Sequence, residues 1–233
     1  MLSAIAIVPS APVMVPELAA AAATETADLR DAALSAVAKL PPRWIGVGVG
    51  DAGMDEDTVA GPDSAGTFAG YGADVRVGLS PEAHGRHPAR LPLCALITGW
   101  LRGRAQPQAS AEVRAYRSDH DLGAALAFGR RMRAEIDRTA ERVGVVVVAD
   151  GANTLSPPAP GGYHPDSIPV QAALDDALAA GDRAALTRLP DGIIGRTAYQ
   201  VLAGLIDAAP RSAGELYRGA PYGVGYFVGV WHP

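Results

Sequence analysis

Polar side chains follow three apolar runs that have the length of buried strands, and these side chains are the first candidates for chemistry. They are Ser10 after residues 2–8, Asp51 after residues 44–49, and Asp150, Asn153 and His164 after residues 143–149. Ser10, His164 and Asp150 have the types needed for a nucleophile, its base and the group that orients the base. Asp51, Asp150 and His164 could instead hold a divalent cation that activates water for hydrolysis. Both chemistries require the three loops to meet in space.

The elements around these loops predict such a meeting. The three apolar runs are nearly continuous, which is typical of strands covered on both faces, and helical periodicity recurs between them. Strands that alternate with helices predict an α/β fold with three α/β/α layers around a mainly parallel central sheet. The carboxyl ends of parallel strands share one edge, where sites usually open. The loops expected at that edge are residues 9–16, 50–72 and 150–168.

The other elements follow from shorter patterns. Helices are predicted over residues 29–40, 122–136, 170–180, 183–189 and 195–208, and further strands over residues 75–79 and 113–117. Residues 51–73 are expected to form a long loop, and the state of the apolar segment 91–101 stays open. Asp119 or Asp121 is expected to cap the helix near residue 122. Two β-like runs around residues 219–223 predict a C-terminal β-hairpin, within one domain of residues 1–233.

Composition excludes several classes of function. The net charge is -5, and no basic stretch has aromatic residues interleaved with it, so nucleic acid is not an expected partner. No apolar stretch reaches the roughly 18 residues that a membrane span needs. Three early prolines and the lack of a basic residue before Arg30 argue against a signal peptide, so a cytoplasmic location is expected. The expected partners are a small-molecule ligand and further copies of the chain.

Three other motifs have simpler structural interpretations. Residues 48–53 match the dinucleotide-binding pattern G-x-G-x-x-G, but acidic residues follow and would repel phosphate, so a tight strand-ending loop is favoured. His84 and His87 lie between prolines, where an exposed loop pair is favoured over a metal site. The single cysteine, Cys94, lies in an apolar run and is predicted to be a buried, inert thiol.

Three longer segments carry a resemblance to a known family. The opening Ile7-Val-Pro-Ser-Ala-Pro-Val-Met-Val-Pro-Glu, the loop from Asp150-Gly-Ala-Asn to Asp166, and the ending Ala220-Pro-Tyr-Gly-Val-Gly-Tyr-Phe-Val resemble the class III extradiol ring-cleavage dioxygenase B-subunit-like family. The resemblance spans nearly the whole chain and implies the same α/β fold. It also implies an iron-dependent oxidoreductase, in which two imidazoles and one carboxylate hold Fe(II).

The residues that this chemistry needs are replaced at the matching positions. Ser10 stands where the family has its first iron-binding histidine, and Gly50-Asp51 stands where the second is expected. No residue matches the carboxylate ligand, while His164 lies in the kind of loop that carries the family's acid/base histidine. A hydroxyl and a lone carboxylate do not replace two imidazoles on Fe(II). We therefore expect no metal or other cofactor.

The protein is expected to bind a small molecule in a pocket at the carboxyl ends of the strands and to lack iron-dependent ring-cleavage activity. Ser10, Asp51, Asp150 and Asn153 are predicted to surround the ligand, with His164 as the catalytic candidate. One alternative is a divalent-metal-dependent hydrolase or dioxygenase that uses Asp51, Asp150 and His164. Another is a non-catalytic assembly or regulatory subunit. Elemental analysis for a bound metal tests the first alternative. Light scattering together with a partner pull-down separates the second alternative from a pocket-bearing monomer.

Overall fold

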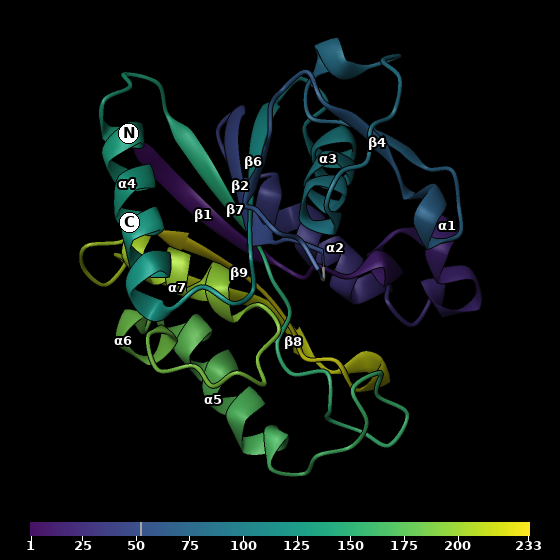
Figure 1. Cartoon of the computed structure of the whole chain (residues 1–233), viewed down its shortest axis with the longest axis vertical. Coiled ribbons are helices and arrows are strands. Elements are labelled where there is room, and N and C mark those ends of the chain that lie inside the picture. The colour runs from purple at the N-terminus through teal and green to yellow at the C-terminus, as the bar shows by residue number, and fades with distance from the viewer. Residues whose placement is uncertain (52) are drawn as a thin grey trace.

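A seven-stranded sheet runs through the computed structural model, which describes residues 1–51 and 53–233 (Figure 1). Its strands are β1 (Leu2–Val8), β2 (Arg43–Val49), β3 (Thr58–Ala60), β6 (Ser110–Tyr116), β7 (Val143–Val148), β8 (Ser212–Gly219) and β9 (Tyr226–His232). They lie in the order β3-β6-β2-β7-β1-β9-β8. The four strands β6, β2, β7 and β1 are parallel, whereas β3 at one edge and β9 and β8 at the other are antiparallel to their neighbours.

Helices cover both faces of the sheet. On one face lie α2 (Ala27–Val37) and α3 (Leu93–Ala105), and on the other lie α4 (Leu122–Asp137), α5 (Ser167–Ala180), α6 (Arg183–Leu186) and α7 (Arg196–Leu205); the short α1 (Pro16–Ala19) follows β1. Figure 1 shows the two helical layers with the sheet between them. The predicted three-layer α/β/α class is therefore confirmed, with a sheet that is parallel only in its centre.

The central position of β7 follows from its sequence. Every side chain of this strand is buried, because β7 pairs with β1 on one side and with β2 on the other while helices cover its two faces. Val146 and Val148 face the helices α2 and α3, whereas Val145 and Val147 face the opposite layer. Burial of each valine contributes about 1.5–3 kcal/mol, and β-branched side chains suit a pleated surface.

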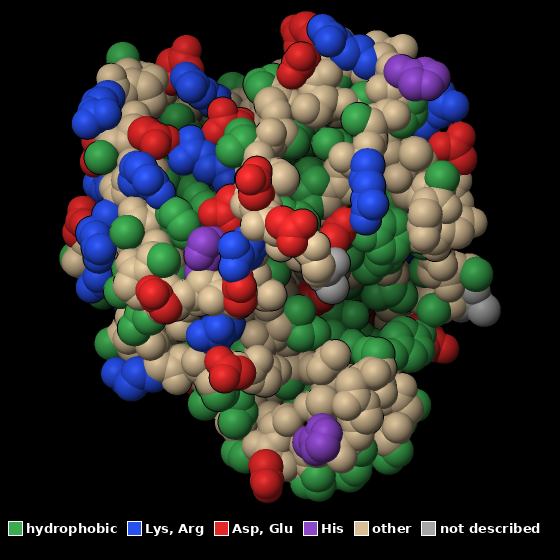
Figure 2. Space-filling model, viewed as in Figure 1, with side chains coloured by type: hydrophobic (Ala, Val, Ile, Leu, Met, Phe, Trp, Pro, Cys, Tyr) green, Lys and Arg blue, Asp and Glu red, His purple; other side chains and the backbone are tan. Residues whose placement is uncertain are grey.

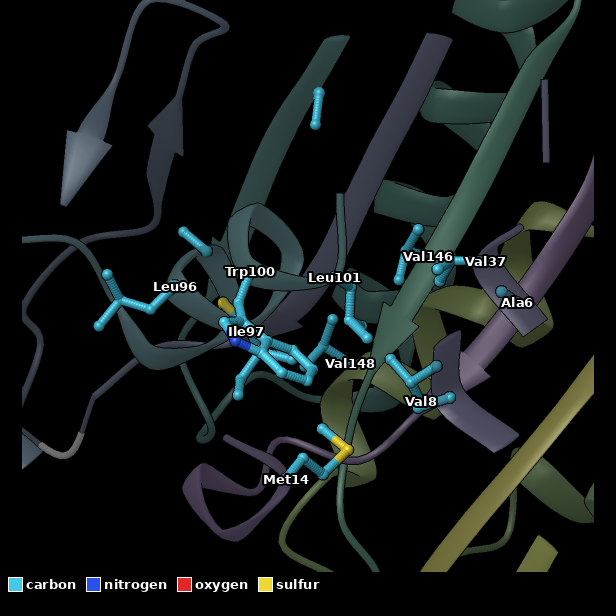
Figure 3. Packing of buried hydrophobic residues seen from close by; sticks show 14 of the residues in the cluster. Ala6, Val8, Met14, Val37, Leu96, Ile97, Trp100, Leu101, Val146 and Val148 are labelled. Atoms are coloured by element: carbon cyan, nitrogen blue, oxygen red, sulfur yellow. The ribbon is translucent and has the colours of Figure 1, made fainter. Parts of the chain in front are cut away.

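The apolar segment 91–101, whose state the sequence left open, contributes most of α3. Pro92 precedes the first helical residue, a position at which proline is tolerated. In Figure 3, Ile97, Trp100 and Leu101 of α3 lie near Val148 in the core. The helix approaches β2 so closely that a Cβ atom added to Gly48 would lie 2.3 Å from the Cβ of Cys94. A glycine in β2 therefore permits this helix to pack.

One prediction for the segment between β2 and α3 needs correction. Residues 51–73 are not irregular throughout, because they contain β3 and the strand β4 (Ala65–Thr67). Each of these strands has only three residues, too few for alternation to stand out within a polar segment. The strand predicted over residues 75–79 exists as β5 (Arg76–Gly78), which pairs with β4 in a separate two-stranded sheet.

The C-terminal hairpin and the cap of α4 were also predicted. Strands β8 and β9 pair antiparallel, and β9 inserts beside β1, so the hairpin is confirmed and forms one side of the sheet. Asp121, and not Asp119, caps α4, because its Oδ1 accepts a hydrogen bond from the backbone N–H of Ala124 at 2.8 Å. Asp119 instead pairs with Arg117. Within residues 1–51 and 53–233, no helix combines the length and the apolar character needed to span a bilayer.

Candidate functional site at the strand ends

The carboxyl ends of β1, β7 and β2 meet around a cavity of about 320 Å³. The chain leaves β1 and β2 toward the helices of one face and leaves β7 toward the helices of the other, which is the topology at which a crevice forms. Ser10, Asp51 and Asp150 line this cavity together. Figure 2 shows a hollow near the centre of this face of the molecule, with hydrophobic side chains in it and acidic side chains near its edge.

Asp150 has the most unusual environment of these residues. Its Oδ1 accepts a hydrogen bond of 2.7 Å from the backbone N–H of Ser10, while its Oδ2 has no hydrogen-bond partner among the described residues. Burial raises the pKa of this carboxyl to about 7, and the Ser10 hydrogen bond opposes the rise only in part. Near neutral pH, Asp150 is therefore present in both its protonated and its ionised form, as a proton-exchanging group requires.

Asp51 lines the side of the cavity where α3 begins. Its Oδ1 accepts a hydrogen bond of 3.3 Å from the backbone N–H of Leu93, the first residue of α3, so the carboxylate lies at the positive end of the helix dipole. Arg90, whose side chain is 92% exposed, lies 4.0 Å from its Oδ2. Asp51 thus has both a backbone and an ionic partner. Its first role is to hold the start of α3 at the cavity.

A buried amide side chain holds the loop that follows β7. Gln171 of α5 accepts a hydrogen bond of 2.8 Å from the backbone N–H of Ala152 and donates one of 2.8 Å to Asp175. Its side chain is packed so closely between Gly151 and Gly225 that a Cβ atom on either glycine would lie within 2.2 Å of it. The backbone N–H of Gly151 donates to the carbonyl of Gly225, and the N–H of Gly225 donates to the carbonyl of Ala152, both at 2.8 Å. The position of Asp150 is therefore fixed by α5 and by the start of β9.

The structure does not bring all of the predicted site residues together. Of the five, Ser10, Asp51 and Asp150 line the cavity, whereas Asn153 and His164 do not. Asn153 is partly buried, and its carbonyl accepts a hydrogen bond from the N–H of Gly161. His164 is exposed, and its backbone N–H bonds to the carbonyl of Thr154. The catalytic role of His164 stays a prediction that this cavity does not support.

Several residues of the cavity were missed by sequence reasoning. Tyr71, Leu93 and Ile194 form much of its apolar wall. Tyr71 ends the short 3₁₀ helix Phe68–Tyr71, and burial, followed by the charge of Asp51, raises the pKa of its phenol. These residues come from segments that fold back over the strand ends, so no local pattern marks them. Beside Ile194, a Cβ atom at Gly195 would lie 2.7 Å from the carbonyl oxygen of Asp150, so the chain needs a glycine there to pass.

The donor groups do not fit the iron site that the resemblance implies. Among the lining residues that the structure describes, none is histidine, and the candidates for metal donors are the hydroxyls of Ser10 and Tyr71 and two carboxylates. Fe(II) sites with open positions use two imidazoles and one carboxylate. In the described part of the chain, no group of three or more His, Cys, Asp or Glu side chains is placed to hold a metal ion.

The other motifs of the sequence have structural roles. Gly48 and Gly50 of the G-x-G-x-x-G string allow close packing, because Cβ atoms there would collide with Cys94 and Met54. Cys94 is buried, and burial raises the pKa of its thiol to about 12, so the thiol stays protonated. His84 and His87 are both exposed, as the exposed-loop interpretation predicts.

One comparison with known proteins finds a match, and it shows the fold alone. The chain is similar to the crystal structure of an uncharacterized protein, JW3007, from Escherichia coli K12, with a TM-score of 0.57 and 10% sequence identity. The match covers 99% of this chain and 100% of that chain. A match at this identity shows that the α/β fold is shared along the whole length. No protein-family model matches the sequence. No curated protein matches it either.

Proposed function

We propose that this chain binds a small organic molecule at the strand ends, by a hydrogen bond between Asp150 and a hydroxyl or ammonium group of the ligand. The observation that carries the proposal is Oδ2 of Asp150, which has no hydrogen-bond partner among the described residues, in a cavity at the topological switch point. Because its pKa is about 7, the carboxyl can accept a proton from the ligand or donate one to it near neutral pH. Asp150 would therefore serve in binding and in proton exchange.

The charge of the cavity restricts the ligand. Its described lining residues include two carboxyl groups, Asp51 and Asp150, and no lysine, arginine or histidine. Arg90 lies near Asp51, and no ion pair among the described residues includes Asp150. An anionic ligand would be repelled there, whereas an ammonium group or a neutral hydroxyl would complement the site. The ligand is therefore expected to be neutral or cationic.

The size and walls of the cavity restrict the rest of the molecule. Its volume of about 320 Å³ is at the low end of the range of about 300–1,000 Å³ for ligand pockets. Leu93, Val148 and Ile194 provide aliphatic surface, and Tyr71 provides an aromatic ring. Such walls favour a compact apolar body, such as one aromatic ring. Extradiol-type ring cleavage is not proposed, because the residues do not supply the imidazoles that iron requires.

A matched series of ligands tests the proposal. Benzyl alcohol, benzylamine and benzoate share one ring and differ in the charge of the attached group, and their binding can be followed by NMR of the labelled protein. Benzyl alcohol and benzylamine are expected to shift the signals of Asp150 and Tyr71, with benzoate binding more weakly. Asp150→Asn should weaken benzylamine binding, while Asp207→Asn, on an exposed side chain elsewhere, should leave it unchanged.

Two results would overturn the proposal. The first is that none of the three compounds binds at the strand ends, or that Asp150→Asn binds benzylamine as the unmodified chain does. The second is stoichiometric iron in the gently purified protein, together with oxygen-dependent cleavage of catechol. The latter result would restore the iron chemistry that the resemblance implies.

A further inference from the structure

A second and larger cavity lies away from the strand ends, between the β4–β5 sheet and the C-terminal half of α3. Its volume is about 720 Å³, and it shares no described lining residue with the first cavity. The segment 81–88 closes one side of it. Figure 1 shows β4 beside α3, and the lining residues Gly99, Trp100 and Arg102 place the cavity against this helix, whose first residue, Leu93, donates its backbone N–H to Asp51.

The side chains of this cavity are basic, although the whole chain carries a net charge of -5. Arg76, Arg86, Arg102, Arg104 and His84 line it, and none of its described lining residues is Asp or Glu. Guanidinium groups present paired N–H donors that match the oxygens of carboxylates and phosphates. The basic lining therefore complements an anion, in contrast to the carboxyl groups of the first cavity.

Arg102 forms a fixed point in the wall. It is only 7% exposed, and its guanidinium is held by neutral carbonyls: Nε donates to Gly78 at 2.8 Å, and Nη1 donates to Pro107 at 2.6 Å. Its Nη2 has no hydrogen-bond partner in residues 1–51 and 53–233, and none of the ion pairs among them includes Arg102. Desolvation lowers its pKa, and the nearby charge of Glu82 opposes this effect only in part. An anion at Nη2 would add a direct counter-charge.

The three exposed arginines can turn toward a ligand. Arg76 and Arg86 each lie 3.5 Å from a carboxylate outside the lining, and Arg104 lies 3.3 Å from another. Their side chains are all more than half exposed. Exposed pairs of this kind contribute about 0–1 kcal/mol, so little is lost when a guanidinium changes partner. The position of Arg102 and Arg104 at the end of α3 also suits the helix dipole, but that effect does not account for Arg76 or Arg86.

We propose that this cavity binds a small organic polyanion, with Arg102 as the buried anchor and Arg76, Arg86 and Arg104 as the outer contacts. The walls between the charges are apolar, because Trp100, Val77 and Pro88 line the same space. Such walls favour a carbon-containing ligand over a bare inorganic ion. The anionic groups are carboxylates or phosphates, which guanidinium binds with the same geometry.

Calorimetric titration of the full chain at low salt tests this proposal. Citrate is the carboxylate probe and fructose 1,6-bisphosphate is the phosphate probe, both of which contain carbon, and the tighter of the two indicates the chemistry of the natural ligand. We expect one site per chain. The double variant Arg76→Gln/Arg86→Gln should weaken binding by about tenfold or more, as expected for the loss of two charge-assisted hydrogen bonds.

The matched control is Arg43→Gln/Arg133→Gln, which removes the same charge from two arginines that lie outside this cavity. This variant should bind the probes as the unmodified chain does. If both double variants bound the probes equally weakly, the probes would be attracted by the overall charge of the chain and not by this cavity, and the proposal would be overturned. Absence of binding by both probes would overturn it as well. A third variant, Arg102→Lys, keeps the charge but loses the planar fork, and it should bind more weakly while it remains folded by circular dichroism.

Discussion

The backbone N–H of Ser10 donates a hydrogen bond of 2.7 Å to Oδ1 of Asp150, a residue 140 positions further along the chain. Each residue lies two positions beyond the end of its strand, so the contact joins the carboxyl ends of β1 and β7. The resemblance of the sequence implies a metal-binding histidine at position 10, and the chain has a serine there. The structure thus has a direct contact between two neighbouring loops at the expected position of a metal ligand.

The ionisation of Asp150 predicts a specific change of stability with pH. Because the pKa of this carboxyl is raised to about 7 in the folded state, the folded chain holds a proton there that the unfolded chain releases near pH 4. The stabilisation is complete at low pH and is lost as the pH rises toward 7. Between pH 5 and pH 8, the free energy of unfolding should fall by about 1–3 kcal/mol more in the unmodified chain than in Asp150→Asn.

Urea denaturation of both proteins at several pH values measures this difference. Asp175, whose pKa burial raises to about 6, contributes in the same direction, but it is present in both chains and cancels from the comparison. The prediction fails if the two free energies of unfolding change in parallel over this range of pH.

Replacement of Gln171 should destabilise the loop that carries Asp150. In Gln171→Leu, the N–H of Ala152 and the carboxyl of Asp175 both lose a buried partner, so the free energy of unfolding should decrease by about 2–4 kcal/mol. The pKa of Asp175 should also rise further, because the Gln171 hydrogen bond lowers it. Gln108→Leu, on an exposed side chain, is the control. Equal stability of the two variants in denaturant titrations would contradict the role assigned to Gln171.

The approach of α3 to β2 predicts opposite effects at two glycines. Gly48→Ala should destabilise the chain by about 1–3 kcal/mol, because its new Cβ would lie 2.3 Å from the Cβ of Cys94. Gly103 lies in α3, and a Cβ atom there would have no other atom within 4 Å, so Gly103→Ala should stabilise the chain by about 0.5–1 kcal/mol. Thermal unfolding measures both. If Gly48→Ala were neutral, the packing of α3 against β2 described above would be wrong.

The sequence predicted the fold better than the site, and the reason is physical. Buried parallel strands such as β7 leave a continuous apolar run, and the polar residue that follows each one lies at a shared edge whatever the loops do. Ser10, Asp51 and Asp150 were therefore predicted to lie near one another. The strands β3 and β4 were missed because three residues carry too little periodicity to separate a strand from a loop.

The walls of the cavity depend on tertiary contacts that no local pattern encodes. Tyr71 and Ile194 come from segments far apart in the chain, and they meet only because their loops fold back over the strand ends. His164 was assigned from its place in a loop, but the loop's own hydrogen bonds, including that from His164 N–H to Thr154, leave the residue exposed. Gln171 offered no signal either, since a buried glutamine in a helix looks like a surface residue in sequence.

The pH dependence of benzylamine binding tests the role of Asp150 most directly. Benzylamine stays protonated from pH 5.5 to 8.5, so any change of its affinity over this range reports a group on the protein. In the unmodified chain, affinity should rise as the pH passes through about 7, where Asp150 becomes a carboxylate. In Asp150→Asn, affinity should be weaker and independent of pH. The same pH profile in both proteins would contradict the proposal that Asp150 holds the ligand.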